Sequence, residues 1–309
     1  MDSNQKHLLH WKDWDAGEIR EVLELAVDAK LNPEKYAEAL KAKTLVMLFQ
    51  KTSTRTRVSF EAGMTELGGH AIYLDWRSSN FGLTRTWYEA AYLSTNAHIL
   101  MARVKEHSEL QEIAKGSRVP VINGCDDKYH PCQALADMLT IRLDRGSLEG
   151  AKLTYVGVMN NVSNSLVSLA PVFGVQLTLV CPVAPKEDRD HEVLEQARQA
   201  GVLVETLDAK AAVKDADYVY TDTWVNMEYF NDPSAKELKE ERIRTMLPYQ
   251  VNADLLKGSA AKVMHDMPIH PGYEIAEELV EEDRSIIFEQ ASNRLPAQKA
   301  IMLRLLGKA

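Results

Sequence analysis

The sequence has few cysteines, no excess of positive charge and no long apolar run. Its 309 residues include three cysteines, Cys125, Cys132 and Cys181, without a Cys-x-x-Cys pair, which excludes a disulfide framework or zinc knuckle and is typical of the reducing cytosol. The formal net charge of −9 argues against sequence-independent binding to nucleic acid, which needs a basic stripe. No stretch approaches the roughly 20 apolar residues that span a bilayer, and the N-terminus lacks the apolar core of a signal peptide. We therefore expect a cytoplasmic protein with neither a membrane nor a nucleic-acid partner.

Nucleotide-binding signatures are also missing. There is no Gly-x-x-x-x-Gly-Lys-Ser/Thr run, so a P-loop is unsupported. The stretch "VGVMNN" has only Gly157 of the dinucleotide fingerprint, which makes a nicotinamide-dependent oxidoreductase a distant alternative.

Apolar strand-like runs alternate with amphipathic helical patterns along most of the chain. Residues 15–42 have helical spacing with Asp15 as the N-cap, "TLVMLFQK" and "HAIYLD" are typical strands, and a helix is expected between them over residues 54–67. Alternation of this kind predicts parallel sheets that are covered by helices on both faces. The other expected strands are "HILMARV", "VPVING", "KLTYVGV", "QLTLVCP", "VLVETL" and "YVYTDTW", with helices around residues 108–115, 131–145, 163 onward, 191–200 and 209.

The two series of strands predict an α/β protein with two tandem doubly wound parallel-sheet domains. The helix over residues 131–145 is expected to bridge them. We expect the first domain at residues 1–145 and the second at 146–290. Residues 291–309 are expected to form a terminal helix that returns to the first domain, with Leu295, Ile301, Met302 and Leu305 available for packing.

A cluster of hydroxyl and arginine side chains lies where the first strand gives way to a helix. Ser53, Thr54, Arg55 and Thr56 come at the carboxyl end of a strand, which is where doubly wound folds bind ligands. The first turn of a helix has backbone N–H groups without intrahelical partners, and Arg55 adds a fork of donors, so the pattern indicates an anion site. From these residues alone, an ordinary capped helix start with solvated arginines is equally consistent. Arg57 falls on the opposite side of the helix and is interpreted as structural or interfacial.

Three more residues are expected at strand ends of the same half. Arg103 ends the strand in "HILMARV", and His130 and Gln133 open the helix that starts at Pro131. Taken singly, such an arginine is usually solvated and such a histidine usually caps a helix. In this order and at these intervals, however, the "STRTR", "LMARV" and "YHPCQALAD" stretches resemble the aspartate/ornithine carbamoyltransferase family, from about residue 45 to 306.

The resemblance implies a transfer of the carbamoyl group of carbamoyl phosphate to an amine. Ser53, Thr54, Arg55 and Thr56 would hold the phosphate, while Arg103, His130 and Gln133 would bind the carbamoyl end. Negative charge develops on the carbamoyl oxygen as the amine attacks, and preorganised donors stabilise it. The leaving group is already activated, so neither a cofactor nor a metal is expected. Arg294 in "SNR" resembles the family's arginine that lines the active-site cleft.

The acceptor motifs resemble the ornithine branch. "YTDTWVNMEYF" matches its Asp-x-Trp-x-Ser-Met-Gly motif at Asp222, Trp224 and Met227, and Asn161 resembles the contact to the acceptor's α-carboxylate. Asp222 would pair with the α-amino group, and Asn226 would complete the acceptor site. Adjacent asparagines after a strand are otherwise typical of a turn. Acidic residues here have the wrong sign for aspartate, so ornithine or a similar cationic amine is expected.

Several positions depart from the branch. Asn226 and Glu228 replace Ser and Gly, and "HDMP" places Asp266 where the branch has Cys. A carboxylate beside the attacking amine favours its protonated form, so Asp266 would act as its base or select a more cationic acceptor. Alternatively, its neighbours hold it away from the reaction. These changes leave open a carbamoyltransferase for another acceptor, or a catalytically silent phosphate-binding regulatory paralogue.

The resemblance also implies a homotrimer with active sites shared between subunits. The loop that would reach the neighbouring site reads "RSSNFGLTRTWYEAA" and lacks the usual bacterial sequence. Arg85 is a candidate phosphate contact from the adjacent chain, and Trp87 is a candidate for the acceptor pocket.

Overall fold

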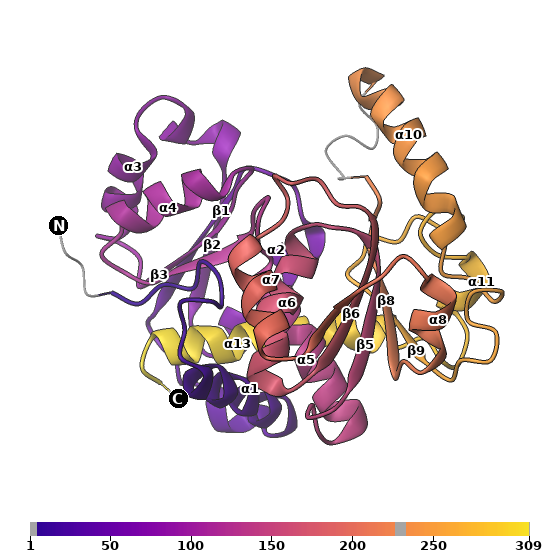
Figure 1. Cartoon of the computed structure of the whole chain (residues 1–309). Helices are drawn as coiled ribbons and strands as arrows, with labels where there is room; N and C mark the ends of the chain where they lie inside the picture. Colours follow the sequence, from indigo (N-terminus) through magenta and orange to yellow (C-terminus); the bar gives the residue numbers. More distant parts are fainter. Residues whose placement is uncertain (1–4, 226–232, 309) are drawn as a thin grey trace. The chain divides into compact units, whose positions relative to one another are not determined.

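The computed structural model describes residues 5–225 and 233–308, which fall into two compact units. One consists of Met1–Leu139 with Asn293–Ala309, and the other of Thr140–Ser292. Each unit contains a parallel β-sheet with helices around it, as Figure 1 shows. The fold class expected from the sequence is therefore confirmed. In the described ranges, no helix combines the length and apolarity that crossing a membrane would require.

The first unit has a four-stranded parallel sheet in the order β2-β1-β3-β4. β1, β3 and β4 are buried along most of their length because helices cover the sheet, whereas β2, at the edge, has no buried residue. The strands are β1 (Thr44–Phe49), β2 (His70–Asp75), β3 (Ile99–Arg103) and β4 (Val121–Cys125). The helices are α1 (Ala16–Leu31), α2 (Thr54–Glu66), α3 (Thr86–Leu93), α4 (His107–Gly116), the first part of α5 (Pro131–Arg145) and α13 (Arg294–Leu305), with short 3-10 turns at Pro33–Tyr36, Trp76–Ser78 and Asn80–Gly82.

The terminal helix α13 packs against α1 and α2, as expected from its apolar pattern, and lies beside α1 in Figure 1. An ion pair between Arg304 and Glu18, 3.2 Å long, joins α13 to α1. This packing returns the last helix, and with it Arg294, to the first unit.

The second unit has a five-stranded parallel sheet in the order β7-β6-β5-β8-β9. Its strands are β5 (Lys152–Val158), β6 (Gln176–Val183), β7 (Leu203–Glu205), β8 (Tyr218–Thr221) and β9 (Lys262–His265). Its helices are the remainder of α5, α6 (Asn161–Phe173), α7 (His191–Gln199), α8 (Ala209–Lys214), α10 (Lys236–Met246), α11 (Glu277–Val280) and α12 (Ile287–Ser292), with 3-10 turns at Pro233–Ala235 and Leu247–Tyr249.

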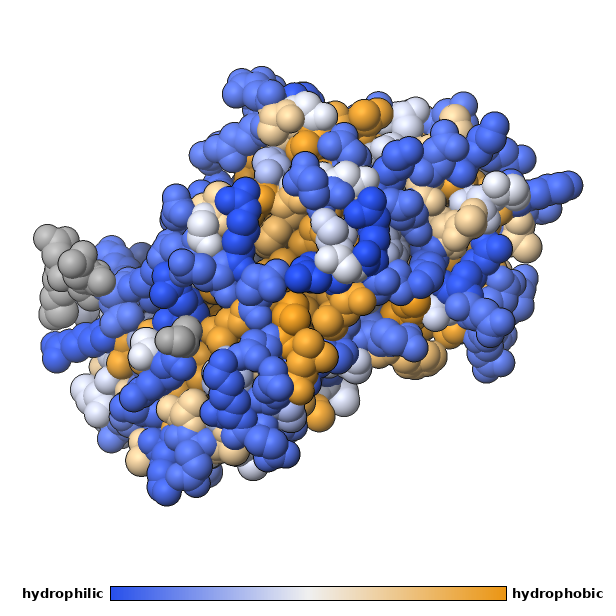
Figure 2. All heavy atoms as spheres, turned by 90° about the horizontal axis from the view of Figure 1, so that it is seen from below, coloured by the Kyte–Doolittle hydropathy of each residue, from blue (hydrophilic) through white to orange (hydrophobic). Residues whose placement is uncertain are grey.

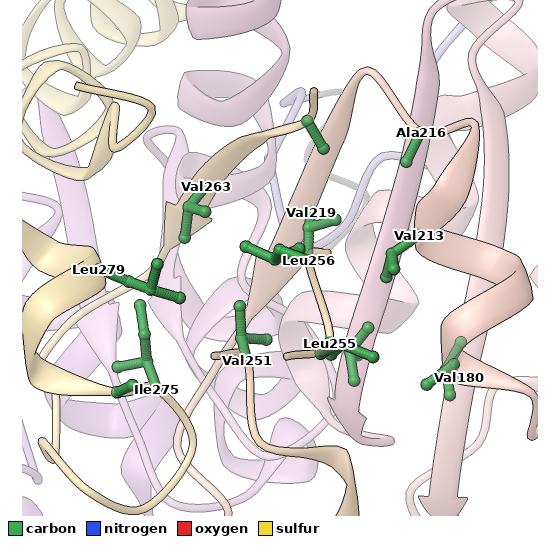
Figure 3. Packing of buried hydrophobic residues seen from close by; sticks show 14 of the residues in the cluster. Val180, Val213, Ala216, Val219, Val251, Leu255, Leu256, Val263, Ile275 and Leu279 are labelled. Carbon is green, nitrogen blue, oxygen red and sulfur yellow. The ribbon is translucent and has the colours of Figure 1, made fainter. Parts of the chain in front are cut away.

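The core of the second unit is built from aliphatic side chains of strands, helices and loops. Val219 of β8 and Val263 of β9 meet Val213 of α8 and Leu256 and Ile275 from the later loops, as Figure 3 shows. All five side chains are buried. Outside such cores, charged and polar residues cover most of the face seen in Figure 2. The packed core fixes the ends of β8 and β9, where polar residues follow.

Three elements differ from the sequence-based prediction. The helix expected over residues 15–42 begins at its predicted cap, Asp15, but ends at Leu31, because Pro33 disfavours a helical conformation at Asn32. The stretch over residues 77–91, which was expected to be a loop, contains most of α3, whose N-cap Arg85 makes no side-chain capping bond. The sequence also did not predict β9, which immediately precedes Asp266.

Candidate active site

The turn between β1 and α2 forms the hydroxyl-lined start of a helix. Ser53 is the N-cap: its Oγ accepts a hydrogen bond from the Thr56 backbone N–H at 3.3 Å and donates to Thr56 Oγ1 at 3.0 Å. Thr54 and Arg55 fill the first two helical positions, so the backbone of this turn presents N–H groups at the positive end of the helix. Thr56 is fully buried. The turn therefore has the geometry of an anion site.

Arg103 is brought to this turn by the pairing of β3 with β1. Phe49 is its register partner, and the Arg103 carbonyl accepts a hydrogen bond from the Gln50 N–H at 2.8 Å. The Arg103 Nε is buried, and it has no hydrogen-bond partner within residues 5–225 and 233–308. A buried donor without a protein partner is costly, and an anionic ligand would satisfy it.

His130 lies among cationic side chains and is only 3% exposed. Burial lowers its pKa well below the ordinary value of 6.5, and electrostatic repulsion from Arg294, Arg103, Lys51 and Arg55 lowers the pKa further. The imidazole is therefore held neutral at physiological pH, with one ring N–H able to donate. The sequence motifs did not single out Lys51; its signal was a cation two residues before the cap, in the turn that follows β1.

Arg294 joins the start of α2 to the start of α5. It donates to Gln133 Oε1 and to Thr56 Oγ1, both at 2.8 Å. Gln133 Nε2 in turn donates to Asp137 Oδ1 at 2.8 Å, which orients the amide so that its oxygen faces Arg294. That oxygen keeps a second lone pair with which to accept a hydrogen bond from a ligand N–H. The structure thus brings Thr56, Gln133 and Arg294 together from three distant parts of the chain.

In the second unit, the residues expected to bind the acceptor follow β5 and β8, which are neighbours in the sheet. Asn160 is the N-cap of α6, and its Nδ2 donates to Asp222 Oδ2 at 2.7 Å. The other oxygen, Asp222 Oδ1, accepts a hydrogen bond from the Thr223 N–H at 2.7 Å. Asn161 is the first residue of α6, beside this pair. Asn160 therefore orients the Asp222 carboxyl, a role that the sequence did not predict.

Asp222 and Asp266 are adjacent because of strand register. Thr221 pairs with His265 across β8 and β9, so each aspartate comes one residue after its strand ends. Burial raises the pKa of Asp222 well above its ordinary value, repulsion from Asp266 raises the pKa further, and hydrogen bonds from Thr223 and Asn160 act in the opposite direction without offsetting this. A cationic group placed here would favour the ionised carboxyl.

A buried glutamate braces the loop that carries Asp266. His265 Nδ1 accepts a hydrogen bond from the Met267 N–H at 2.7 Å, so its Nε2 carries the hydrogen that faces Glu274 Oε1 at 3.1 Å. The same Glu274 oxygen accepts a hydrogen bond from the His270 N–H at 2.6 Å, and His270 Nδ1 lies 3.2 Å from Thr223 Oγ1. Burial acts to raise the pKa of Glu274, but hydrogen bonds from His265 and His270 outweigh it and lower the pKa to about 2. The sequence did not indicate this cluster.

Other predicted residues lie elsewhere or outside the described part of the chain. Asn226 and Met227 fall within residues 226–232, which are not described. Arg57 forms an exposed 3.0 Å ion pair with Glu61, and its guanidinium lies 3.8 Å from the centre of the Tyr73 ring. Of the two loop candidates, Arg85 is exposed at the N-cap of α3, and Trp87 packs edge-on against Tyr88, with 4.1 Å between ring centroids.

Comparison with known proteins covers both units. Residues 6–143 match the model of the aspartate/ornithine carbamoyltransferase carbamoyl-P binding domain, and residues 149–305 match that of the Asp/Orn binding domain. The chain is 44% identical to an ornithine carbamoyltransferase of Archaeoglobus fulgidus, over 98% of each chain. It is 42% identical to one of Methanosarcina acetivorans, over 98% of this chain and 99% of that protein. The solved ornithine carbamoyltransferase of Pyrococcus furiosus superimposes with a TM-score of 0.89 at 38% identity, over 99% of both chains. This protein belongs to the aspartate/ornithine carbamoyltransferase family.

Proposed function

We propose that this protein is an ornithine carbamoyltransferase, which transfers the carbamoyl group of carbamoyl phosphate to the side-chain amine of ornithine and releases citrulline and phosphate. Sequence similarity over nearly the whole chain to proteins that bear this name supports ornithine, rather than another amine, as the acceptor. The main observation in support of this reaction is the set of cationic side chains around a neutral His130. The cations supply positive charge for a phosphate, and His130 supplies a neutral donor for the carbamoyl oxygen.

In this proposal the turn from Ser53 to Thr56 holds the phosphate. Arg103 and His130 donate to the carbamoyl oxygen as it becomes negative, and Gln133 accepts from the carbamoyl amide. Arg294 positions Gln133 and Thr56 through its two 2.8 Å hydrogen bonds. The departing phosphate remains within reach of Arg55 and Lys51, whose charges offset those that develop on it.

The acceptor half of the proposal rests on charge. Asp222 would pair with the α-ammonium of ornithine, Asn161 would contact the α-carboxylate, and Asn226 and Met227 would complete the site. Asp266 would accept the proton that the side-chain amine loses when it attacks. Each of these groups would act on a ligand that is positively charged when it arrives.

The direct test supplies the purified protein with carbamoyl phosphate and ornithine, and measures citrulline and phosphate. Lysine, putrescine and aspartate form the comparison panel. Stoichiometric citrulline and phosphate with ornithine support the proposal. Calorimetric binding of carbamoyl phosphate without turnover of any acceptor would instead indicate a silent phosphate-binding subunit.

The substitution Asp266→Cys tests the acceptor site. If Asp266 contributes to acceptor choice, the variant shifts in preference toward ornithine relative to lysine and putrescine, while its affinity for carbamoyl phosphate is unchanged. The loss of the Asp266 charge also removes repulsion that raises the pKa of Asp222. Asp254→Cys, at an exposed position of the same unit, is the control. An unchanged ratio of kcat/KM values across the acceptors would refute this role.

We also propose a cytoplasmic homotrimer. All three cysteines are thiols, which suits a reducing compartment, and the trimer is what the family resemblance implies. A light-scattering mass of three times the 34.7 kDa chain, or a multiple of that, tests the assembly.

A further inference from the structure

The N-terminal segment, residues 7–11, lies beside β4, where Leu8 forms an isolated parallel bridge with Ile122. The Leu8 N–H donates to the Val121 carbonyl, and the Asn123 N–H donates to the Leu8 carbonyl, both at 2.8 Å. The Asn123 side chain also donates to the Leu9 carbonyl at 2.8 Å. Two residues after Leu9, the segment reaches Trp11, which contacts the residue that follows His130.

Trp11 anchors this segment directly beside His130. Its indole Nε1 donates to the Pro131 carbonyl at 2.9 Å, and the side chain is 1% exposed. Pro131 is the first residue of α5 and follows His130 in the chain. The neighbouring Trp14 has the same chemistry but a different target, because its Nε1 donates to the His7 carbonyl at 3.0 Å.

Tyr129, the residue before His130, is also held by hydrogen bonds. Buried Asp126 closes a turn in which its Oδ1 accepts from the Tyr129 N–H at 2.6 Å and its own N–H donates to the Tyr129 carbonyl at 3.1 Å. His107 Nδ1 lies 2.6 Å from the other oxygen of Asp126. The His10 ring packs on the Tyr129 ring with 5.0 Å between centroids. The N-terminal segment thus contacts both neighbours of His130.

We propose that the N-terminal segment positions His130 for the carbamoyl-transfer step, with Trp11 as the positioning residue. The inference rests on the proposed function, in which His130 stabilises charge that develops only in the transition state. A donor of that kind must be held in place before the reaction, and a misplacement of about 1 Å can cost about 10²-fold in rate. Trp11 does so without touching the substrate, through the carbonyl of the residue next to His130.

The test compares Trp11→Phe with Trp14→Phe. Both variants keep a buried aromatic ring and lose one indole N–H that bonds to a backbone carbonyl, but only Trp11 is bonded next to His130. We expect Trp11→Phe to lower kcat about tenfold, between the roughly fivefold of one lost hydrogen bond and the ~10² of a 1 Å misplacement. The KM for carbamoyl phosphate should stay within about twofold, since the Ser53 turn is untouched, and Trp14→Phe should match the wild type. Each rate is divided by the concentration of active sites, which is measured by titration with a tight-binding phosphonate analogue of both substrates.

A double-mutant cycle separates positioning from general stability. If Trp11 acts through His130, Trp11→Phe has no further effect on kcat in a His130→Asn background. An equal loss in both backgrounds, or equal losses in the two tryptophan variants, would overturn the proposal. If Trp11→Phe does not fold, benzothienylalanine at position 11 keeps the bicyclic ring and replaces only the N–H with sulfur; normal kcat in that protein would also overturn it. A wild-type protein that makes no citrulline would refute the proposed function, which is a distinct outcome.

Discussion

The two units carry opposite charges at the ends of their parallel strands. In the first unit, Arg294, Arg103, Lys51 and Arg55 act on His130 and lower its pKa. In the second, Asp266 acts on Asp222, and both this repulsion and burial raise the pKa of Asp222. Without a ligand, each site thus favours the neutral form of its central titratable group.

This difference shows how a chain with a net charge of −9 can bind a phosphorylated substrate. The positive charge is local, and it comes from the turn between β1 and α2, from α2, from β3 and from the start of α13, rather than from a basic surface. The acidic site is equally local, because the pairing of β8 with β9 brings Asp222 next to Asp266. Substitutions that alter one site should therefore leave the ligand of the other site unaffected.

The largest expected effect comes from Arg103→Gln. The buried guanidinium would donate to the carbamoyl oxygen, and loss of one such donor costs about 2.7–4 kcal/mol, or about 10²–10³ in kcat. Removing its charge also raises the pKa of His130, so the acid limb of the kcat/KM profile should move to higher pH. Steady-state kinetics from pH 5 to 9 measure both effects.

Arg118→Gln, at an exposed position of the same unit, should behave as the wild type. Ornithine affinity should be the same in both variants when it is measured with carbamoyl phosphate saturating. A decrease in ornithine affinity in Arg103→Gln similar to the decrease in kcat would contradict the division of charge between the units.

A smaller effect is expected from Asp222→Asn. A hydrogen bond to a charged group contributes about 1.5–3 kcal/mol, so the KM for ornithine should rise about 10- to 100-fold. Calorimetry should find carbamoyl phosphate binding unchanged. Asp217→Asn is the matched control, because Asp217 precedes the same strand, β8, at its opposite end and accepts from the Lys152 N–H at 2.9 Å. Equal KM values for ornithine in the two variants would rule out Asp222 as its ligand.

Much of this arrangement was predictable from local patterns. Ser53 caps α2, and Arg103 ends β3, because strand alternation and capping residues are visible within a few positions. The hydrogen bond between Arg294 and Thr56 was not predictable from pattern, since 238 positions separate the two residues. The resemblance assigned Arg294 to the cleft, but the partners of its guanidinium depend on how α13 packs.

Elements without clear end signals were missed. Helix α3 lacks a side-chain cap at Arg85, and β9 is four residues long with no alternation in "KVMH". Without β9, the adjacency of Asp222 and Asp266 could not be derived, because it depends on the pairing of Thr221 with His265. The hydrogen bond between His265 and Glu274 could not be predicted for the same reason.

The smallest expected effect concerns the hydrogen bonds that Glu274 accepts from His265 and His270. It tests whether the charge of Glu274 stabilises the second unit. The folded state lowers the pKa of Glu274 to about 2, below its ordinary value of 4.5, so it favours the carboxylate. The resulting stability is fully present above about pH 4.5 and is lost as the pH falls toward about 2. Gln at this position can still accept from His265 and His270, but without charge. Glu274→Gln should therefore lower the free energy of unfolding by about 1–2 kcal/mol at pH 6–7.

Urea unfolding followed by circular dichroism measures this gap, the difference in free energy of unfolding between variant and wild type. The gap for Glu274→Gln should narrow steadily below pH 4.5. Glu278→Gln, on the exposed face of α11, should show no gap at any pH. A gap that stays constant down to pH 3 would mean that the shape of the side chain, rather than its charge, holds the Asp266 loop.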